Sequence, residues 1–219
     1  MTDRQTPVNI LIVDDHPMVR EGMALRISAE RDLKVCGETA TQDEALALVE
    51  QVSPHLMIVD ISLKRGHGIE LIKQVKSRYP SVKMLVVSGY QESLYAERAL
   101  RAGALGYLNK QESNDKLIEA IRTVLNGERY LSAELTRRLV GQALGNCDET
   151  KTLIEQLTDR ELEILRMIGQ GQTSGAIANN LLLSPHTIDT HRENIKRKLG
   201  ARNAAELSRQ AVQWVLENG

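Results

Sequence analysis

The sequence predicts an α/β domain with a doubly wound, five-stranded parallel sheet, followed by a smaller all-α domain of four helices. Over the first 125 or so residues, short apolar runs alternate with segments of helical periodicity, which is the pattern of repeated βαβ units. From Leu157 onward only helical patterns occur. Between these two regions the polar stretch GNCDETKT (145–152) is typical of a linker.

Five apolar runs are the expected strands. Parallel strands that are covered on both faces read as continuous apolar runs, and these five do so. Right-handed crossovers between them place the strands in one sheet, for which we expect the order 2-1-3-4-5. The runs are VNILIV (8–13), LKVCGE (33–38), HLMIVD (55–60), VKMLVV (82–87) and ALGYL (104–108).

Helical segments separate the runs, among them residues 17–28 and the segment around Ile69, Ile72 and Val75. The clearest one precedes Gly127, which can end it, and follows Ser113, which can cap it. Its apolar residues recur at i, i+1, i+4, i+7 and i+8, on one helix face. These are Leu117, Ile118, Ile121, Val124 and Leu125.

Capping signals define the helices of the second domain. Thr158-x-x-Glu161 predicts a capping box, Ser184-Pro185 predicts an N-cap followed by proline, and Asn203-x-x-Glu206 opens the last helix. One further helix, at about 133–144, is expected before the linker. The four helices of the second domain are expected at about 159–169, 174–181, 185–199 and 203–216.

The composition of the 219-residue chain fits a soluble globular protein, with 42% hydrophobic and 26% charged residues and a net charge of −1. Cys36 and Cys147 lie far apart, without metal-ligand spacing, and are interpreted as free thiols in a reducing compartment. The N-terminal stretch MTDRQTPVN is polar, and no apolar run approaches the length of a membrane span. We therefore expect a cytoplasmic protein without a membrane partner.

The ends of the expected strands carry polar residues that such a sheet would gather at one edge. Asp14 and Asp15 follow the first strand, Asp60 the third, Ser88 the fourth and Lys110 the fifth. Three carboxylates in one small site raise each other's pKa and need a counter-charge. A hard divalent cation such as Mg²⁺, which prefers oxygen ligands, provides it. A carboxylate beside the metal and a lysine can then accept a phosphoryl group.

These five residues, in this order, resemble the receiver domain of two-component response regulators over roughly residues 8–126. The resemblance implies that Asp60 is the phosphoacceptor, assisted by Lys110 and Ser88. It implies that Mg²⁺ is bound by Asp15 directly, by Asp14 mainly through water, by Asp60 and by the backbone carbonyl of Ser62. It also implies that Tyr107 is an aromatic switch, turning inward when Ser88 engages the phosphoryl group.

Two positions depart from the receiver pattern. Lys64 and Gln111 stand where receivers usually carry proline. Neither change removes a phosphoryl ligand, but both lie in loops that control access to the acceptor, which leaves the dephosphorylation rate and the choice of kinase open.

The helix expected at 185–199 has an apolar face, formed by Ile188, Ile195 and Leu199, and a polar opposite face. A turn of about three residues joins it to the preceding helix, which is helix-turn-helix spacing. Positive charge is concentrated on it and just beyond, where DNA phosphates would lie. The basic residues are Arg192, Lys196, Arg197, Lys198 and Arg202, against one acid, Glu193.

The stretch from Leu157 to Leu207 resembles the DNA-binding domain of the NarL/LuxR class. The resemblance implies that several side chains of the 185–199 helix face DNA, and Asp189 or Glu193 could accept a hydrogen bond from a cytosine amino group. The residues taken to face DNA are Thr187, Thr190, His191, Asn194, Lys196 and Arg197. Family members often carry Asn-Lys-Glu where Ser174-Gly175-Ala176 stands and a basic residue where Asp189 stands.

Together the two resemblances predict a phosphorylation-controlled transcriptional regulator. The expected domains are a receiver (1–126), a linker with one helix (127–155) and a LuxR-type helix-turn-helix domain (156–219). The expected partners are a sensor histidine kinase as phosphodonor, double-stranded DNA, and a second copy of the chain on phosphorylation. Two alternatives remain open: a metal-dependent hydrolase, against which Ser62 argues because it is no general acid, and a DNA-binding module with a vestigial pocket.

Overall fold

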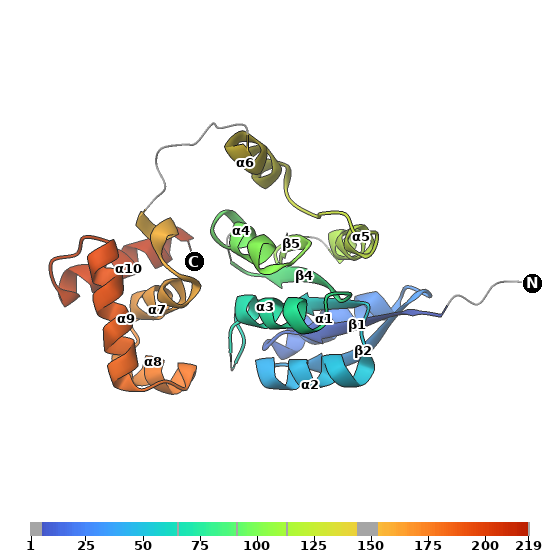
Figure 1. Ribbon diagram of the computed structural model, residues 1–219, viewed down its shortest axis with the longest axis horizontal. Coiled ribbons are helices and arrows are strands. Elements are labelled where there is room, and N and C mark those ends of the chain that lie inside the picture. Colours follow the sequence, from blue (N-terminus) through green and yellow to red (C-terminus); the bar gives the residue numbers. More distant parts are fainter. Residues whose placement is uncertain (1–5, 65, 91, 113, 144–152, 219) are drawn as a thin grey trace, which may run out of the picture. The chain divides into compact units, whose positions relative to one another are not determined.

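The computed structural model describes residues 6–218, apart from 65, 91, 113 and 144–152. They belong to two compact units, residues 1–136 and residues 137–219. Figure 1 shows the helices and strands of both units. The 145–152 stretch, Cys147 and the expected cap Ser113 lie outside the described residues. None of the described helices is long and apolar enough to cross a membrane.

The first unit contains one five-stranded parallel sheet of order β2-β1-β3-β4-β5, as expected. Each strand begins and ends within about two residues of its expected bounds. The strands are β1 (Val8–Val13), β2 (Leu33–Thr39), β3 (Leu56–Val59), β4 (Lys83–Ser88) and β5 (Gly106–Asn109).

Five helices alternate with these strands and cover both faces of the sheet. α1 and α5 pack against each other over one face, while α3 lies between α2 and α4 in a second layer. The helices are α1 (Pro17–Ser28), α2 (Gln42–Val52), α3 (Gly68–Arg78), α4 (Glu92–Ala102) and α5 (Asn114–Leu125).

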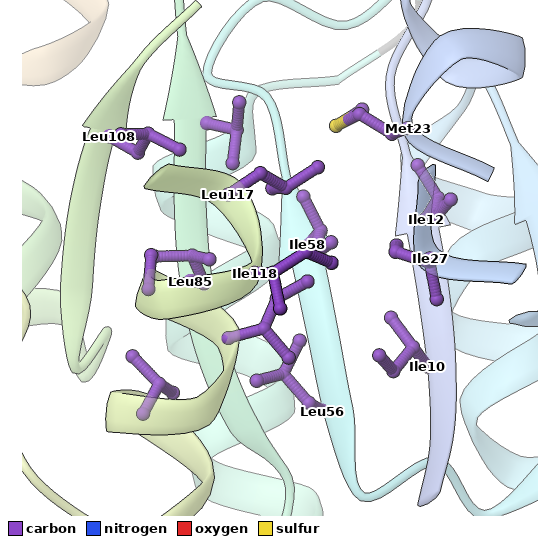
Figure 2. Close-up of a cluster of buried hydrophobic side chains, with 14 of the residues drawn as sticks. Ile10, Ile12, Met23, Ile27, Leu56, Ile58, Leu85, Leu108, Leu117 and Ile118 are labelled. Atoms are coloured by element: carbon purple, nitrogen blue, oxygen red, sulfur yellow. The ribbon is translucent and has the colours of Figure 1, made fainter. Parts of the chain in front are cut away.

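Alternation along the strands divides the core between the two faces. Ile10 and Ile12 of β1 point toward α1 and α5, where they meet Leu117 and Ile118 (Figure 2). Leu11, which points to the opposite face, is also fully buried. Burial of each such side chain contributes about 1.5–3 kcal/mol. The sheet is therefore fixed between two helical layers, and its strand ends are held in register.

After α5 the chain turns at Gly127, whose φ of 84° lies in the left-handed region that favours glycine. Tyr130 then forms a parallel bridge to Gly106 at the edge of β5. The Tyr107 N–H donates to Tyr130 O (2.9 Å), and the Tyr130 N–H donates to Leu105 O (3.1 Å). α6 (Ala133–Ala143) follows, with Leu135 buried.

In the second unit, the described residues that follow α6 form a short 3₁₀ turn, η1 (Leu153–Gln156), and then four α-helices. α7 packs against α10 so closely that a Cβ added to Gly169 would lie 2.4 Å from the carbonyl oxygen of Ala211. α9 packs against both α7 and α8. The helices are α7 (Asp159–Gly169), α8 (Ser174–Leu181), α9 (Pro185–Lys198) and α10 (Ala204–Asn218).

The capping signals explain where these helices begin. Thr158 and Glu161 form the expected capping box at α7, and Ser184 caps α9 by accepting from the Thr187 N–H. At α10 the Asn203 side chain accepts from the Glu206 N–H (2.9 Å), and the Glu206 carboxylate accepts from the N–H of Arg202 (2.8 Å).

Candidate functional site

The acidic site lies at the carboxyl edge of the sheet, where backbone pairing positions its residues. The Asp60 N–H donates to Val13 O (2.8 Å), which places Asp60 beside the end of β1. The Lys110 N–H donates to Ser88 O (2.9 Å), which places Lys110 beside the end of β4. Loops that end strands of one parallel sheet thus bring together residues up to a hundred positions apart in the chain.

The carboxylate of Asp60 is engaged on both oxygens. The Ser88 hydroxyl donates to Oδ1 (2.7 Å), and the Lys110 ammonium donates to Oδ2 (2.6 Å). Lys110 Nζ also lies 2.7 Å from Oδ2 of Asp14. Asp14 and Asp60 are 1% and 2% exposed. One ammonium thus serves two buried carboxylates, and Asp15 adds a third carboxylate to the site.

The charges of the site shift the pKa values of its members. Burial, with the nearby Asp60 and Asp14, raises the pKa of the Asp15 carboxyl although His16 opposes the shift. Burial disfavours the charged form of Lys110, but the carboxylates of Asp60 and Asp14 outweigh it and raise the pKa of the ammonium. Lys110 therefore stays positively charged while the site as a whole favours a further cation.

His16 is a member of this site that sequence reasoning missed. Its ring nitrogen Nδ1 lies 2.7 Å from Asp15 Oδ1, 3.2 Å from Asp14 Oδ1 and 3.8 Å from Asp60 Oδ2. Its backbone N–H donates to Asp14 Oδ1 (2.9 Å). The available signal was its position, directly after the aspartate pair at the end of a strand.

The donor set of the site fits a divalent cation. One ligand atom each from Asp14, Asp15, His16 and Asp60 lies within 4.8 Å of the others. Among the described residues, the buried oxygens Asp14 Oδ2 and Asp15 Oδ1 accept no hydrogen bond, although Lys110 and His16 lie beside them as charge partners. Carboxylate oxygens of this kind are the ligands that Mg²⁺ prefers.

The loop after Asp60 is held close to the sheet. A Cβ added to Gly68 would lie 2.1 Å from the carbonyl oxygen of Asp60, so only glycine fits at this approach. The side chain of Gln42 accepts from the His67 N–H (3.1 Å), and Ser62 forms a bridge with His67. These contacts fix the backbone next to the acidic site, including the carbonyl group expected to bind metal.

Tyr107 lies in the inward position. Its ring is 2% exposed, and its hydroxyl donates to Tyr90 O (2.9 Å). Burial raises the pKa of its phenol well above the ordinary value. Ser88 and Tyr107 are both next to the loop that connects β4 to α4, which is the arrangement that a switch between these two residues requires.

In the second unit, α8 and α9 form the expected helix-turn-helix. Leu182, at the end of α8, has a φ of 53°, which lets the chain reverse within three residues. Ile188, Ile195 and Leu199 are buried against the unit's core, as predicted. The polar face of α9 is therefore turned to solvent.

The predicted DNA-facing side chains lie on this face, exposed or half-buried. Asp189, Thr190, Glu193 and Arg197 are exposed. Some are held by neighbours on the same helix: Lys196 Nζ lies 2.5 Å from Glu193 Oε2, and Arg197 donates to Asn194 Oδ1 (3.1 Å). Half-buried members of the set are Thr187, His191, Asn194 and Lys196.

Lys198, one of the five basic residues counted on α9 and just beyond it, does not lie on this polar face. Its ammonium donates to the buried carboxylate of Glu161 (2.6 Å) and to Gln156 O (3.3 Å). Although burial opposes the charge of Glu161, the bonds from Lys198 and Thr158 lower the pKa of this carboxyl. Lys198 therefore lies on the side of α9 that packs against α7.

Comparison with known proteins connects both units to known families. Residues 10–122 match the response regulator receiver domain, and residues 155–211 match the bacterial regulatory proteins of the luxR family. The chain is 31% identical over 214 residues to the uncharacterized transcriptional regulatory protein YxjL of Bacillus subtilis, covering 97% of this chain and 96% of that protein. It is 32% identical over 211 residues to the oxygen regulatory protein NreC of Staphylococcus aureus, covering 94% and 97%.

Solved structures also connect the chain to response regulators. RcsB of Salmonella enterica serovar Typhimurium, bound to promoter rprA in the presence of the phosphomimetic BeF₃⁻, is 26% identical with a TM-score of 0.66, over 93% of this chain and 98% of that one. This class consists of transcription regulators and not of metabolic enzymes. The chain belongs to the two-component response regulators that join a receiver domain to a LuxR-type DNA-binding domain.

Proposed function

We propose that Asp60 accepts a phosphoryl group from a sensor histidine kinase in a Mg²⁺-dependent reaction, and that this event controls DNA binding by α9 and dimerisation. The observation that carries the proposal is the engagement of Asp60 by Ser88 at 2.7 Å and Lys110 at 2.6 Å, beside Asp14 and Asp15.

Each residue of the site has a separate role in phosphoryl transfer. An oxygen of Asp60 bonds to phosphorus while the bond from phosphorus to the kinase histidine breaks, which leaves an acyl phosphate. Lys110 neutralises phosphoryl oxygens in the transition state, and Ser88 donates a hydrogen bond to one of them. Asp14, Asp15, Asp60 and the carbonyl of Ser62 would hold Mg²⁺, which adds positive charge where the phosphoryl oxygens gather.

The switch follows from the same contacts. The Ser88 hydroxyl that donates to Asp60 Oδ1 moves its hydrogen bond to the phosphoryl group, and the inward Tyr107 is stabilised by this shift. Because the Tyr107 N–H is bonded to Tyr130 O, the same strand is joined to the segment that leads into α6. The proposed path therefore runs from Asp60 through β5 toward the linker.

We place the DNA contacts on the polar face of α9. The side chains proposed to contact bases or phosphates are Thr187, Asp189, Thr190, His191, Glu193, Asn194, Lys196 and Arg197. The RcsB structures on promoter DNA support a DNA-binding role for the chain, and a structure of two RcsB dimers on two parallel DNAs supports a dimeric DNA-bound state. Such a regulator works in the cytoplasm, where it meets DNA and the kinase.

Phosphoryl uptake tests the proposal. The full chain is incubated with Mg²⁺ and acetyl phosphate, and the intact mass is then measured. We expect one added phosphoryl group on the wild type and none on Asp60→Asn. Asp32→Asn removes an exposed carboxylate at the opposite end of the sheet and should keep the uptake. A vestigial pocket takes up none in any variant, and a hydrolase consumes the donor without retaining the group.

A further inference from the structure

The imidazole of His16 is placed among the carboxylates of the acidic site and not beside them. Its Nδ1 lies within 4 Å of oxygens from three aspartates that belong to two different strand ends. The ring nitrogen is therefore part of the same group of potential ligand atoms as Asp14, Asp15 and Asp60.

The backbone around His16 holds it in this place. The His16 N–H donates to Asp14 Oδ1 (2.9 Å), and Pro17 begins α1 directly after it. Arg20, one turn into α1, donates to the carbonyl oxygen of Asp14 (2.5 Å). The start of α1 is thus bonded twice to the aspartate that the ring contacts, while 58% exposure of the His16 side chain leaves the site open to solvent and ions.

A nitrogen ligand changes which cation such a site prefers. Mg²⁺ is hard and binds oxygen ligands, whereas imidazole suits first-row transition metals such as Fe, Ni, Cu and Zn. Three carboxylates alone would serve Mg²⁺ and Mn²⁺ alike, since both accept oxygen ligands. An added imidazole favours the transition metal because Mn²⁺ accepts nitrogen ligands more readily than Mg²⁺ does.

We propose that His16 is a fourth ligand of the cation site and gives it a preference for Mn²⁺ and related transition-metal ions over Mg²⁺. The inference rests on the proposed function, because it concerns the cation that serves Asp60. It goes beyond that function by naming a residue that selects the cation.

The experiment measures binding of the metal ions alone to the full chain, without an affinity tag. Isothermal titration with MnCl₂ and with MgCl₂ gives the ratio of the two affinities. For His16→Ala we expect the Mn²⁺ affinity to fall by at least about tenfold, the lower end of the loss seen when even an outer partner of a metal ligand is removed. The Mg²⁺ affinity should change by less than about twofold, because Mg²⁺ does not depend on the imidazole.

A spectroscopic readout separates ligation from a structural role. Electron spin echo envelope modulation of bound Mn²⁺ should show coupling to one ¹⁴N nucleus in the wild type. The coupling should be lost in His16→Ala and kept in His55→Gln, which changes an exposed histidine at the opposite end of the sheet. Folding of each variant is checked by circular dichroism.

Three results would overturn the inference. These are a wild type without nitrogen coupling, an equal loss of both cations in His16→Ala, and tighter Mn²⁺ binding in that variant, which would make His16 a competitor for the site. Asp15→Asn tests the proposed function separately. If it binds both ions as the wild type does, the acidic site is not the cation site, and the magnesium part of that proposal fails as well.

Discussion

Single side chains decide which charges each unit exposes. In the receiver, one ammonium, that of Lys110, contacts the carboxylates of both Asp14 and Asp60. In the DNA-binding unit, Lys198 and Arg197 are neighbours in the sequence but differ in surroundings. Lys198 is bonded to the buried Glu161, whereas Arg197 is exposed on the polar face of α9. This difference predicts different consequences for two similar substitutions.

Lys198→Ala should lower the free energy of unfolding by about 1–3 kcal/mol, since it leaves the buried carboxylate of Glu161 without its cationic partner. Arg197→Ala should change stability by less than about 0.5 kcal/mol, as expected of an exposed side chain. It should instead weaken DNA binding and reduce the slope of log K against log salt by about 1. Urea unfolding followed by Trp214 fluorescence measures the stability of both variants. DNA titrations at several salt concentrations measure the DNA binding of Arg197→Ala. Equal effects of the two variants on stability would contradict the assignment of Lys198.

The same contact predicts a pH dependence. The pKa of Glu161 is lowered in the folded chain, against the opposing effect of burial, by Lys198 and Thr158. Its contribution to stability is therefore present above the ordinary carboxyl pKa of about 4.3 and is lost as the pH falls through the lower folded value. Between neutral pH and the acid range, the free energy of unfolding of the wild type should fall by more than that of Glu161→Gln. Parallel losses would show that Glu161 contributes nothing to the acid sensitivity.

Helices and strands fix where these side chains act. β5 carries Tyr107, and its edge is bonded to Tyr130, while the Ser132 N–H donates to Glu92 Oε1 in α4 (3.0 Å). The segment before α6 is thus attached to both elements that border Tyr107. In the DNA-binding unit, the capping box at α7 and the N-cap of α9 set the start of two of the helices that position the polar face.

The turn between α8 and α9 contains a strained residue. Leu182 has a φ of 53° and is largely exposed, so its side chain gains little from burial. A left-handed conformation costs a non-glycine residue about 1–2 kcal/mol. Glycine avoids this steric cost but loses more conformational entropy on folding, so a substitution by glycine regains only part of it. Leu182→Gly should therefore raise the stability of this unit by about 0.5–1 kcal/mol. Leu216→Gly, an exposed leucine in α10, should lower it by about 1 kcal/mol. Trp214 fluorescence during urea unfolding measures the stability of both variants. A loss of stability in both would contradict the proposed strain at Leu182.

Elements of this kind were predictable because their signals are local. Apolar runs, helical periodicity and capping residues predicted the strand bounds, the helix bounds and the capping box at α7. The order of the strands came from the doubly wound pattern of alternating strands and helices. The site was predictable because the carboxyl ends of parallel strands meet at one edge of the sheet. The residues at or directly after the ends of the expected strands are Asp14, Asp15, Asp60, Ser88 and Lys110.

Side-chain directions set by packing between elements were not predictable. The inward turn of Lys198 depends on where α7 lies against α9. The placement of His16 among three carboxylates depends on the start of α1. The αL turn at Leu182 carries no glycine to signal it.

The whole molecule combines two compact units with different charge patterns. The receiver gathers its carboxylates at one edge of the sheet. The chain as a whole has a net charge of −1, yet the end of α9 is basic. Binding to DNA should therefore depend on local charge and fall steeply with salt. Relatives such as YxjL and NreC match this chain over almost its full length, across both family matches.

At this scale, occupancy of Asp60 in one unit should change the affinity of α9, in the other unit, for DNA. The measurement is the dissociation constant for a duplex selected from a random pool by the full chain, at one salt concentration, with and without phosphorylation by acetyl phosphate and Mg²⁺. We expect phosphorylation to tighten binding of the wild type by about 5- to 150-fold, the usual range of coupling between two sites, and to leave Asp60→Asn unchanged at the weaker affinity. Equal affinities of the phosphorylated and unphosphorylated wild type, with uptake confirmed by mass, would contradict control of DNA binding by Asp60.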